Sequence, residues 1–99
     1  MLHIVNKSHT QTSALASCLR LAQPGSALLL TEDAIYAATK GGAAASGIAA
    51  ATATLKVYVL QPDVDARGMA GKLVDGLTAV DYDGFVDLVA EHPNNQSWL

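Results

Sequence analysis

Short apolar runs typical of β-strands alternate along the chain with segments of helical spacing, and this alternation limits the possible folds more than any other feature. The four β-type runs cover residues 2–6, 26–31, 55–60 and 76–81. Strands that are separated by helices form a mostly parallel sheet with helices on its two faces. The sequence therefore predicts an α/β fold: a single three-layer domain over residues 1–99, with a mostly parallel sheet of about four to five strands flanked by helices.

The segments between these runs carry the helical signals. Leu15, Cys18, Leu19 and Ala22 recur at helical spacing, so a first helix is expected before Pro24. Four later segments are expected to be helical at least in part: 32–42, 43–54, 61–74 and 81–92. The second of these is rich in alanine and is weakened in its middle by Gly47. Asp81 begins the last one, where its carboxylate is suited to cap the first free N–H groups.

Composition excludes several classes of function. Hydrophobic residues make up 51% of the 99 positions and charged residues 15%, which is typical of a folded domain and unlike a disordered chain. Six Lys and Arg stand against nine Asp and Glu, giving a formal charge of −3 with no basic cluster. Proteins that bind nucleic acid through its phosphates need such a cluster, so we expect no direct nucleic acid contact.

The cysteine count and the apolar runs indicate the compartment. A single cysteine excludes an internal disulfide, and the first ten residues, MLHIVNKSHT, lack the pattern of a secretory signal. No stretch approaches the roughly 20 apolar residues that span a bilayer. We therefore expect a cytoplasmic protein without a membrane segment.

Neither a nucleotide site nor a metal site is indicated. Gly42 and Gly47 have the spacing of a phosphate-binding loop, but Ile48 and Ala49 stand where that loop needs Lys and Ser or Thr. The three histidines lie at positions 3, 9 and 92, without the paired spacing of zinc ligands. The sequence thus predicts no cofactor and no metal.

Cys18 is the one residue with distinctive covalent reactivity, and two interpretations of it stay open. It shares a predicted helical face with Leu15, Leu19 and Ala22, and free cysteine is among the most buried residue types. Burial would make it a packing residue with a raised pKa. Exposed, its thiolate could instead accept a persulfide sulfur, so Cys18 is a candidate sulfur acceptor but no firm catalytic residue.

The chain ends on NNQSWL, which places the sole tryptophan, Trp98, next to the last residue. Terminal residues usually fray and are usually small and polar, so an aromatic side chain there indicates a packing role. Trp98 is expected to be at least partly buried, either against its own domain or against another protein, since interface hot spots are enriched in tryptophan.

Four segments together resemble the TusB/DsrH family of sulfur-relay subunits. They are MLHIVNKS at the start, SCLRLAQPGSALLLTEDAIYAA after it, LKVYVLQPDVDARG in the middle and VDYDGFVDLVAEHPNNQSWL at the end. The resemblance covers nearly the whole chain. The segment DVDARG, residues 63–68, and the terminal Trp98 and Leu99 are its most diagnostic parts, whereas residues 42–54 are least like the family.

The resemblance implies a subunit that assembles with two related sister subunits, one TusC/DsrF-like and one TusD/DsrE-like. The expected assembly is a heterotrimer or its dimer, a heterohexamer. It passes persulfide sulfur between upstream and downstream carrier proteins, toward 2-thiolation of the wobble uridine of tRNA or, in sulfur-oxidising bacteria, within dissimilatory sulfur metabolism. The principal relay cysteine of the family lies on the TusD/DsrE-like subunit, while DsrH-like members carry a thiol where Cys18 stands.

Three functions therefore remain in view. In the first, the chain is a structural and docking subunit without chemistry of its own, with Trp98 and Leu99 as interface residues. In the second, Cys18 transiently carries sulfur. In the third, the chain is a small-molecule-binding domain, which would require a pocket at the carboxyl ends of the strands. Exposure of Cys18 separates the first two most directly.

Overall fold

The computed structural model describes residues 1–98, which form a five-stranded sheet with the order β4-β3-β2-β1-β5. Every neighbouring pair of strands in this order is parallel. The strands are β1 (Leu2–Val5), β2 (Ala27–Leu30), β3 (Lys56–Leu60), β4 (Leu77–Val80) and β5 (Asn95–Trp98). This arrangement confirms the predicted α/β class and the expected sheet of four to five strands.

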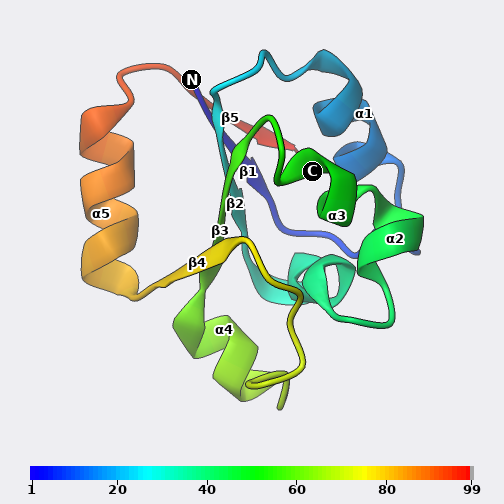
Figure 1. The fold of residues 1–99 in the computed structure, drawn as a ribbon. Helices are drawn as coiled ribbons and strands as arrows, with labels where there is room; N and C mark the ends of the chain where they lie inside the picture. The colour runs from blue at the N-terminus through cyan, green and yellow to red at the C-terminus, as the bar shows by residue number, and fades with distance from the viewer. Residues whose placement is uncertain (99) are drawn as a thin grey trace.

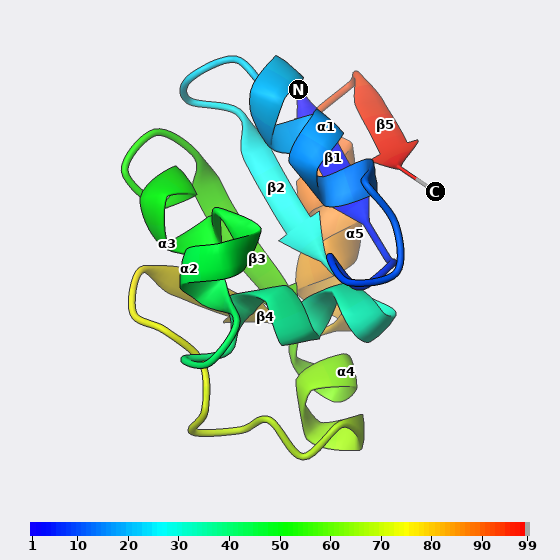
Figure 2. The ribbon, with the colours of Figure 1, turned by 90° about the vertical axis from the view of Figure 1, so that its right-hand side faces the viewer.

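Helices cover both faces of the sheet, as the alternating pattern predicts (Figure 1). They are α1 (Ala14–Leu21), the 3-10 helix η1 (Glu32–Ala38), α2 (Ala43–Ser46), α3 (Ile48–Ala51), α4 (Gln61–Ala66) and α5 (Tyr82–Glu91). Turning the molecule shows α1, η1, α2 and α3 in front of the sheet and α5 behind it (Figure 2). The short helix α4 lies beyond the carboxyl ends of the strands and contacts β3 and η1.

The core is divided by the sheet into two apolar clusters. The larger one joins alternate residues of the central strands, such as Val5, Leu28 and Val59, to the helices of the α1 side. The smaller one places Leu88 of α5 against Leu2, Ala27 and Leu29. Because β2 is covered on both faces, all four of its residues are buried. One helix covers the second face, so that side of the sheet is the thinner layer.

The strand β5 was not located by sequence analysis. Three of its four residues are exposed and polar, so Asn95–Trp98 has no apolar alternation that would indicate a strand. It forms because the chain returns along β1 at the edge of the sheet, in a register that pairs Val5 with Trp98. The position of Trp98 is therefore fixed by backbone pairing as well as by its ring.

The segments around the alanine-rich stretch also differ from expectation. Residues 32–42 form a 3-10 helix that ends at Ala38, and residues 43–54 form two single-turn helices instead of one. Gly47 adopts a left-handed backbone with φ 88°, which ends α2 and starts α3. The last helix follows its prediction, since the Asp81 carboxylate accepts a hydrogen bond of 2.8 Å from the Gly84 N–H.

Candidate functional site

The diagnostic segment 63–68 fastens α4 to the start of η1. Asp63 Oδ2 accepts a 2.7 Å hydrogen bond from the Glu32 N–H, and the Arg67 guanidinium donates to Asp33 Oδ1 at 3.0 and 3.1 Å. Glu32 has a left-handed backbone, φ 49°, which is costly for a residue with a side chain. The Asp63 carboxylate is thus what holds the chain in this conformation directly after β2.

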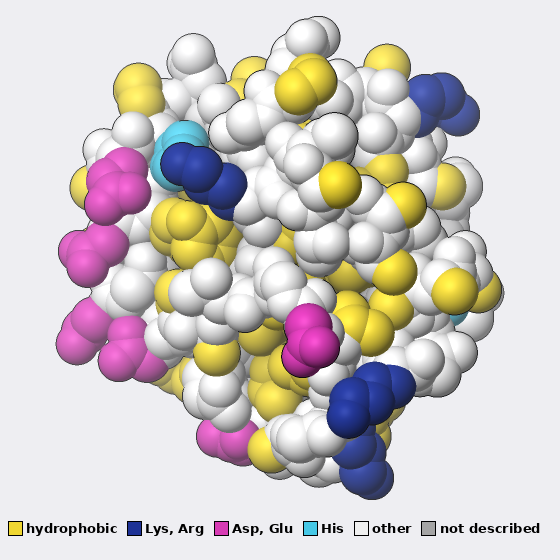
Figure 3. Space-filling view, viewed as in Figure 1, with side chains coloured by type: hydrophobic (Ala, Val, Ile, Leu, Met, Phe, Trp, Pro, Cys, Tyr) yellow, Lys and Arg dark blue, Asp and Glu magenta, His cyan; other side chains and the backbone are white. Residues whose placement is uncertain are grey.

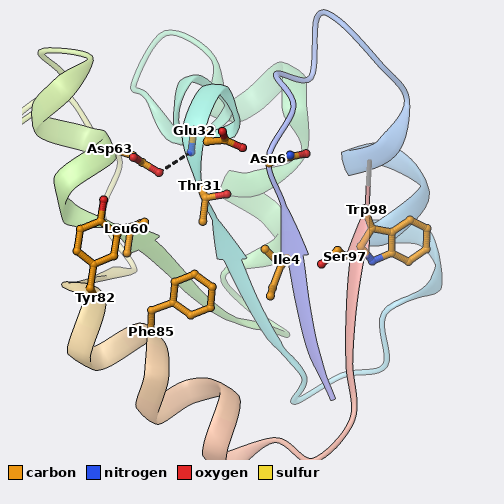
Figure 4. A pocket seen from close by; sticks show the side chains of 10 residues that line it. All are labelled: Ile4, Asn6, Thr31, Glu32, Leu60, Asp63, Tyr82, Phe85, Ser97 and Trp98. Carbon is orange, nitrogen blue, oxygen red and sulfur yellow. Dashed lines mark hydrogen bonds between the residues drawn. The ribbon is translucent and has the colours of Figure 1, made fainter.

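A cavity of about 410 Å³ lies at this same edge of the sheet, and we call it the carboxyl-edge cavity (Figure 4). The ends of β1, β2, β3 and β5 and the starts of η1, α4 and α5 surround it. Its lining residues are Ile4, Asn6, Thr31, Glu32, Leu60, Asp63, Tyr82, Phe85, Ser97 and Trp98. Ligands of parallel α/β sheets bind at the carboxyl ends of the strands. The third function therefore has the pocket that it requires.

Cys18 lies far inside the larger core cluster. Its exposed fraction is 0%, and it packs among apolar residues of α1 and the sheet. Burial raises the pKa of the Cys18 thiol to about 11, so almost no thiolate exists at neutral pH. In this state of the chain Cys18 has the properties of a packing residue.

Trp98 packs on the α1 side of the sheet, next to His3 of the adjoining strand. Its indole Nε1–H donates a 3.2 Å hydrogen bond to His3 Nδ1, and the two ring centroids lie 6.1 Å apart. The ring is partly buried against the larger core cluster. Leu99, the other residue expected at an interface, lies outside the described residues.

The contact with Trp98 requires a neutral His3 ring, and this requirement predicts a pH dependence of stability. Burial, and secondarily the positive N-terminus, lower the pKa of His3 from its usual 6.5. The unfolded chain therefore binds this proton more tightly than the folded chain. The stabilisation is fully present above pH 6.5 and is lost as the pH falls below 6.5 toward the lowered folded pKa.

Urea unfolding at a series of pH values between 7.5 and 5 measures this loss. His3→Gln is the matched control, because its side-chain oxygen can still accept the indole hydrogen but does not titrate. We expect a shallower fall in the free energy of unfolding for His3→Gln than for the wild type. Equal slopes for the two proteins would contradict the assignment to His3.

The outer surface of α5 is apolar. Tyr82, Val86 and Val89 follow one another at positions i, i+4 and i+7, and their exposed fractions are 61%, 66% and 37%. With Phe85 and Ala90 they line a second hollow of about 390 Å³. We call the exposed residues Tyr82, Val86 and Val89 the α5 stripe. Helices of globular proteins usually turn polar residues outward, so this stripe indicates a surface that another protein covers.

No cluster of metal-binding side chains is found in the part of the chain that the structure describes. Within residues 1–98, no three His, Cys, Asp or Glu side chains gather closely enough to hold a metal ion. Over the same residues, no helix is long and apolar enough to cross a membrane.

Comparison with known proteins assigns the family. A family model described as "DsrH like protein" matches residues 7–95. Protein TusB of Klebsiella pneumoniae (strain 342) is 40% identical over 98 residues, which cover 99% of this chain and 100% of that protein. Protein TusB of Pectobacterium parmentieri is 37% identical and that of Escherichia coli (strain K12) 36%, with the same coverage. The chain belongs to the TusB/DsrH family. The resemblance to this family of sulfur-relay subunits is thereby confirmed.

The fold itself recurs beyond detectable sequence similarity. A protein of unknown function from Methanobacterium thermoautotrophicum superposes with a TM-score of 0.73 over 97% of this chain and 95% of that chain. The two sequences are 13% identical, so the likeness concerns the fold alone.

Sequence analysis assigned no role to most of the residues that form the carboxyl-edge cavity and the α5 stripe. It had Asp63 and Arg67 within a diagnostic segment but gave neither a role, and it did not divide the apolar residues of the last helix into a buried and an exposed set. In the structure Leu88 is buried and Val89 is exposed. The spacing Tyr82, Val86, Val89 was the signal that could have shown a second apolar face.

Proposed function

We propose that this chain is a docking subunit of a heteromeric sulfur-relay complex that passes persulfide sulfur toward 2-thiolation of the tRNA wobble uridine. Its partners are a TusC/DsrF-like and a TusD/DsrE-like sister subunit, and the complex works in the cytoplasm. The curated relatives that match over their full length carry the name TusB, which supports the tRNA branch of the family. The complex exchanges sulfur with upstream and downstream carrier proteins, and this chain contacts no nucleic acid itself.

The observation that carries the docking role is the α5 stripe. Three exposed apolar side chains at helical spacing form a continuous ridge, and the hollow beside it is lined by apolar residues of the same helix. Burying such a ridge in a partner removes apolar surface from water, which is the main driving force of stable association. A docking subunit needs a surface of this kind, whereas an isolated binding domain does not.

Charge around the stripe indicates what kind of partner fits. The acidic residues Asp81, Asp83, Asp87 and Glu91 flank it, and acidic side chains gather over α5 at the left edge of Figure 3. The helix itself carries no Lys or Arg. Two copies of this chain meeting through α5 would oppose like charges, so a sister subunit with an apolar surface bordered by basic residues is the better match.

Trp98 and Leu99 are proposed to contribute to the same assembly. The indole is held by His3 and yet stays partly exposed at the end of the edge strand β5. An aromatic ring that is anchored on one side and open on the other is suited to serve as an interface hot spot.

A second candidate function is that of a DsrH-like subunit in dissimilatory sulfur oxidation, with Cys18 as a persulfide acceptor. The thiol in the first helix favours it. Against it stands the complete burial of Cys18 together with its raised pKa, since sulfur transfer requires an accessible thiolate. Cys18 could react only if α1 moved away from the sheet.

Persulfide loading of the assembled complex decides between these functions. The chain is co-expressed with its sister subunits, exposed to a persulfide donor, and every subunit is weighed by mass spectrometry, for the wild type and for Cys18→Ala. We expect no added sulfur on this chain and near-normal transfer in the variant, because the buried thiol cannot attack the donor. Alanine is chosen because it leaves no buried polar group unpaired.

Two results would overturn the docking role. One is a stoichiometric gain of one sulfur on this chain, coupled to loss of transfer in Cys18→Ala, which would make Cys18 a relay residue. The other is a chain that stays a monodisperse monomer and ignores both sister subunits in a pull-down. Sulfur transfer to tRNA uridine, followed by nucleoside mass spectrometry, separates the thiolation branch from the sulfur-oxidation branch.

A further inference from the structure

We propose that the carboxyl-edge cavity binds a protonated amine or a guanidinium group carried on a short apolar chain. Cys18 does not line the cavity, and of the exposed α5 stripe only Tyr82 does. This proposal depends only on the polar groups, charges and walls of the cavity, so it is independent of the proposed docking role.

Unpaired polar groups inside the cavity indicate that a ligand is expected there. Thr31 is 7% exposed and lines the cavity, and its hydroxyl is not among the buried unpaired atoms, so it can be reached from the cavity. Asn6 Oδ1, in the wall of the cavity, is buried and lacks a partner among the described residues. Because buried polar groups are nearly always paired, an unpaired oxygen in the wall beside a reachable hydroxyl is suited to a polar ligand group.

The charge of the lining selects a cation. Glu32 and Asp63 are among the ten lining residues, and none of the ten is basic. Asp63 Oδ2 already accepts the Glu32 N–H, but its Oδ1 has only a distant partner, Arg67 Nη1 at 4.0 Å. The Arg67 guanidinium lies closer to Asp33, at 3.0 Å, and offsets only part of the Asp63 charge from outside the lining. A donor-rich cation therefore meets carboxylate and hydroxyl oxygens that can accept its hydrogens.

An anionic ligand fits this edge poorly, although several helices begin here. Helix starts attract anions when their N–H groups are free. At α5 the Asp81 carboxylate occupies that position by accepting the Gly84 N–H, and Asp83 adds a second negative charge in the first turn. The first turns of η1 and α4 also carry acidic residues. A phosphate or carboxylate would be repelled at the start of each of these three helices.

The remaining walls suit a short apolar chain. Ile4 and Leu60 come from the sheet, and Phe85 projects from α5 toward them (Figure 4). The Tyr82 hydroxyl is directed toward the Asp63 side of the cavity, so an aromatic ring borders the acidic groups. Aromatic faces next to carboxylates favour alkylammonium and guanidinium groups, through cation–π attraction in addition to apolar contact.

Ligand-observed saturation-transfer NMR tests the proposal on the full chain, because the method tolerates self-association. The probes are n-butylammonium and n-butylguanidinium, with butyrate and butanol as controls of similar size. We expect both cations to bind with Kd in the millimolar range, typical of ligands of about five to eight non-hydrogen atoms, and both controls to bind more weakly. Equal signals for cation and butyrate, or no signal for either cation, would overturn the proposal.

Two variants and one control locate the binding. Glu32→Gln and Thr31→Val each preserve side-chain volume, and we expect Glu32→Gln to weaken the cations at least about fivefold, as for loss of one partly solvated ion pair. Asp87→Asn removes the same charge from α5 without touching the cavity and should leave the affinities within about twofold. If Asp87→Asn weakens binding as much as Glu32→Gln, the effect is one of net charge and the site is wrong.

Reconstitution with the sister subunits identifies where the cation comes from. If the butylguanidinium signal persists in the assembled complex, the cavity stays open to a free small amine. If the signal disappears, a sister subunit covers the cavity. Weaker assembly of Glu32→Gln then supports a basic side chain of that subunit as the occupant, and unchanged assembly of Glu32→Gln contradicts it.

Discussion

Replacing Val86 by arginine is expected to weaken assembly with the sister subunits by about 100-fold or more. Val86 is the most exposed member of the α5 stripe, at 66%, and lies in its middle. Arginine would place a bulky charge where the partner is expected to be apolar, and near the basic residues that are expected to complement Asp83 and Asp87. Titration of the purified sister subunits, followed by light scattering or calorimetry, measures the loss.

The matched control is Ala49→Arg. Ala49 is exposed on α3, on the opposite side of the sheet from α5, and arginine is well tolerated in helices. It adds the same charge and bulk away from the stripe, so assembly should stay close to that of the wild type. If both variants weaken assembly equally, net charge and not the stripe is responsible. If neither weakens it, α5 is no interface.

Replacing Trp98 by alanine is expected to lower the free energy of unfolding, or that of assembly, by about 2 kcal/mol or more. The indole packs against the larger core cluster and donates its hydrogen to His3, and alanine removes both contacts. It also leaves a largely buried histidine nitrogen without its donor. Chemical unfolding of the chain and of the complex separates the two effects.

Ser97→Ala is the control for Trp98→Ala. Ser97 precedes the tryptophan in β5, is exposed, and should change stability by less than about 0.5 kcal/mol. Fluorescence gives an independent measurement, because a packed indole should emit at shorter wavelength and resist quenching by iodide. Full quenching together with unchanged stability after removal of residues 97–99 would mean that the tail contributes nothing.

The family, the class of fold and the first four strands, β1 to β4, could be read from the sequence. Apolar runs such as the one at 26–31 require burial on both faces, and their alternation with helical segments allows few arrangements besides a parallel sheet. The helical neighbours of Cys18 favoured a core position, and the structure then decided between the two interpretations by burying it. These conclusions depend on the local spacing of apolar residues, which can be read directly from the sequence.

The boundaries of the helices between residues 32 and 54 could not be predicted from the sequence. The pattern predicted two helices, whereas the chain forms a 3-10 helix and two single turns. Alanine has a high helix propensity, but short helices gain their stability from packing, and Gly47 ends the first turn by adopting a left-handed backbone. Contacts with the sheet decided these boundaries.

By itself the sequence determined that this chain makes a parallel α/β sheet and belongs among the TusB/DsrH proteins, and it left the exposure of its one thiol open. Only the tertiary structure decided that Asn95–Trp98 is a fifth strand, that Trp98 donates to His3, and that Thr31, Glu32 and Asp63 meet around one cavity. The physical reason is distance along the chain. Local spacing fixes which face of an element is apolar, but pairing across 95 residues and the meeting of strand ends depend on how the elements close together.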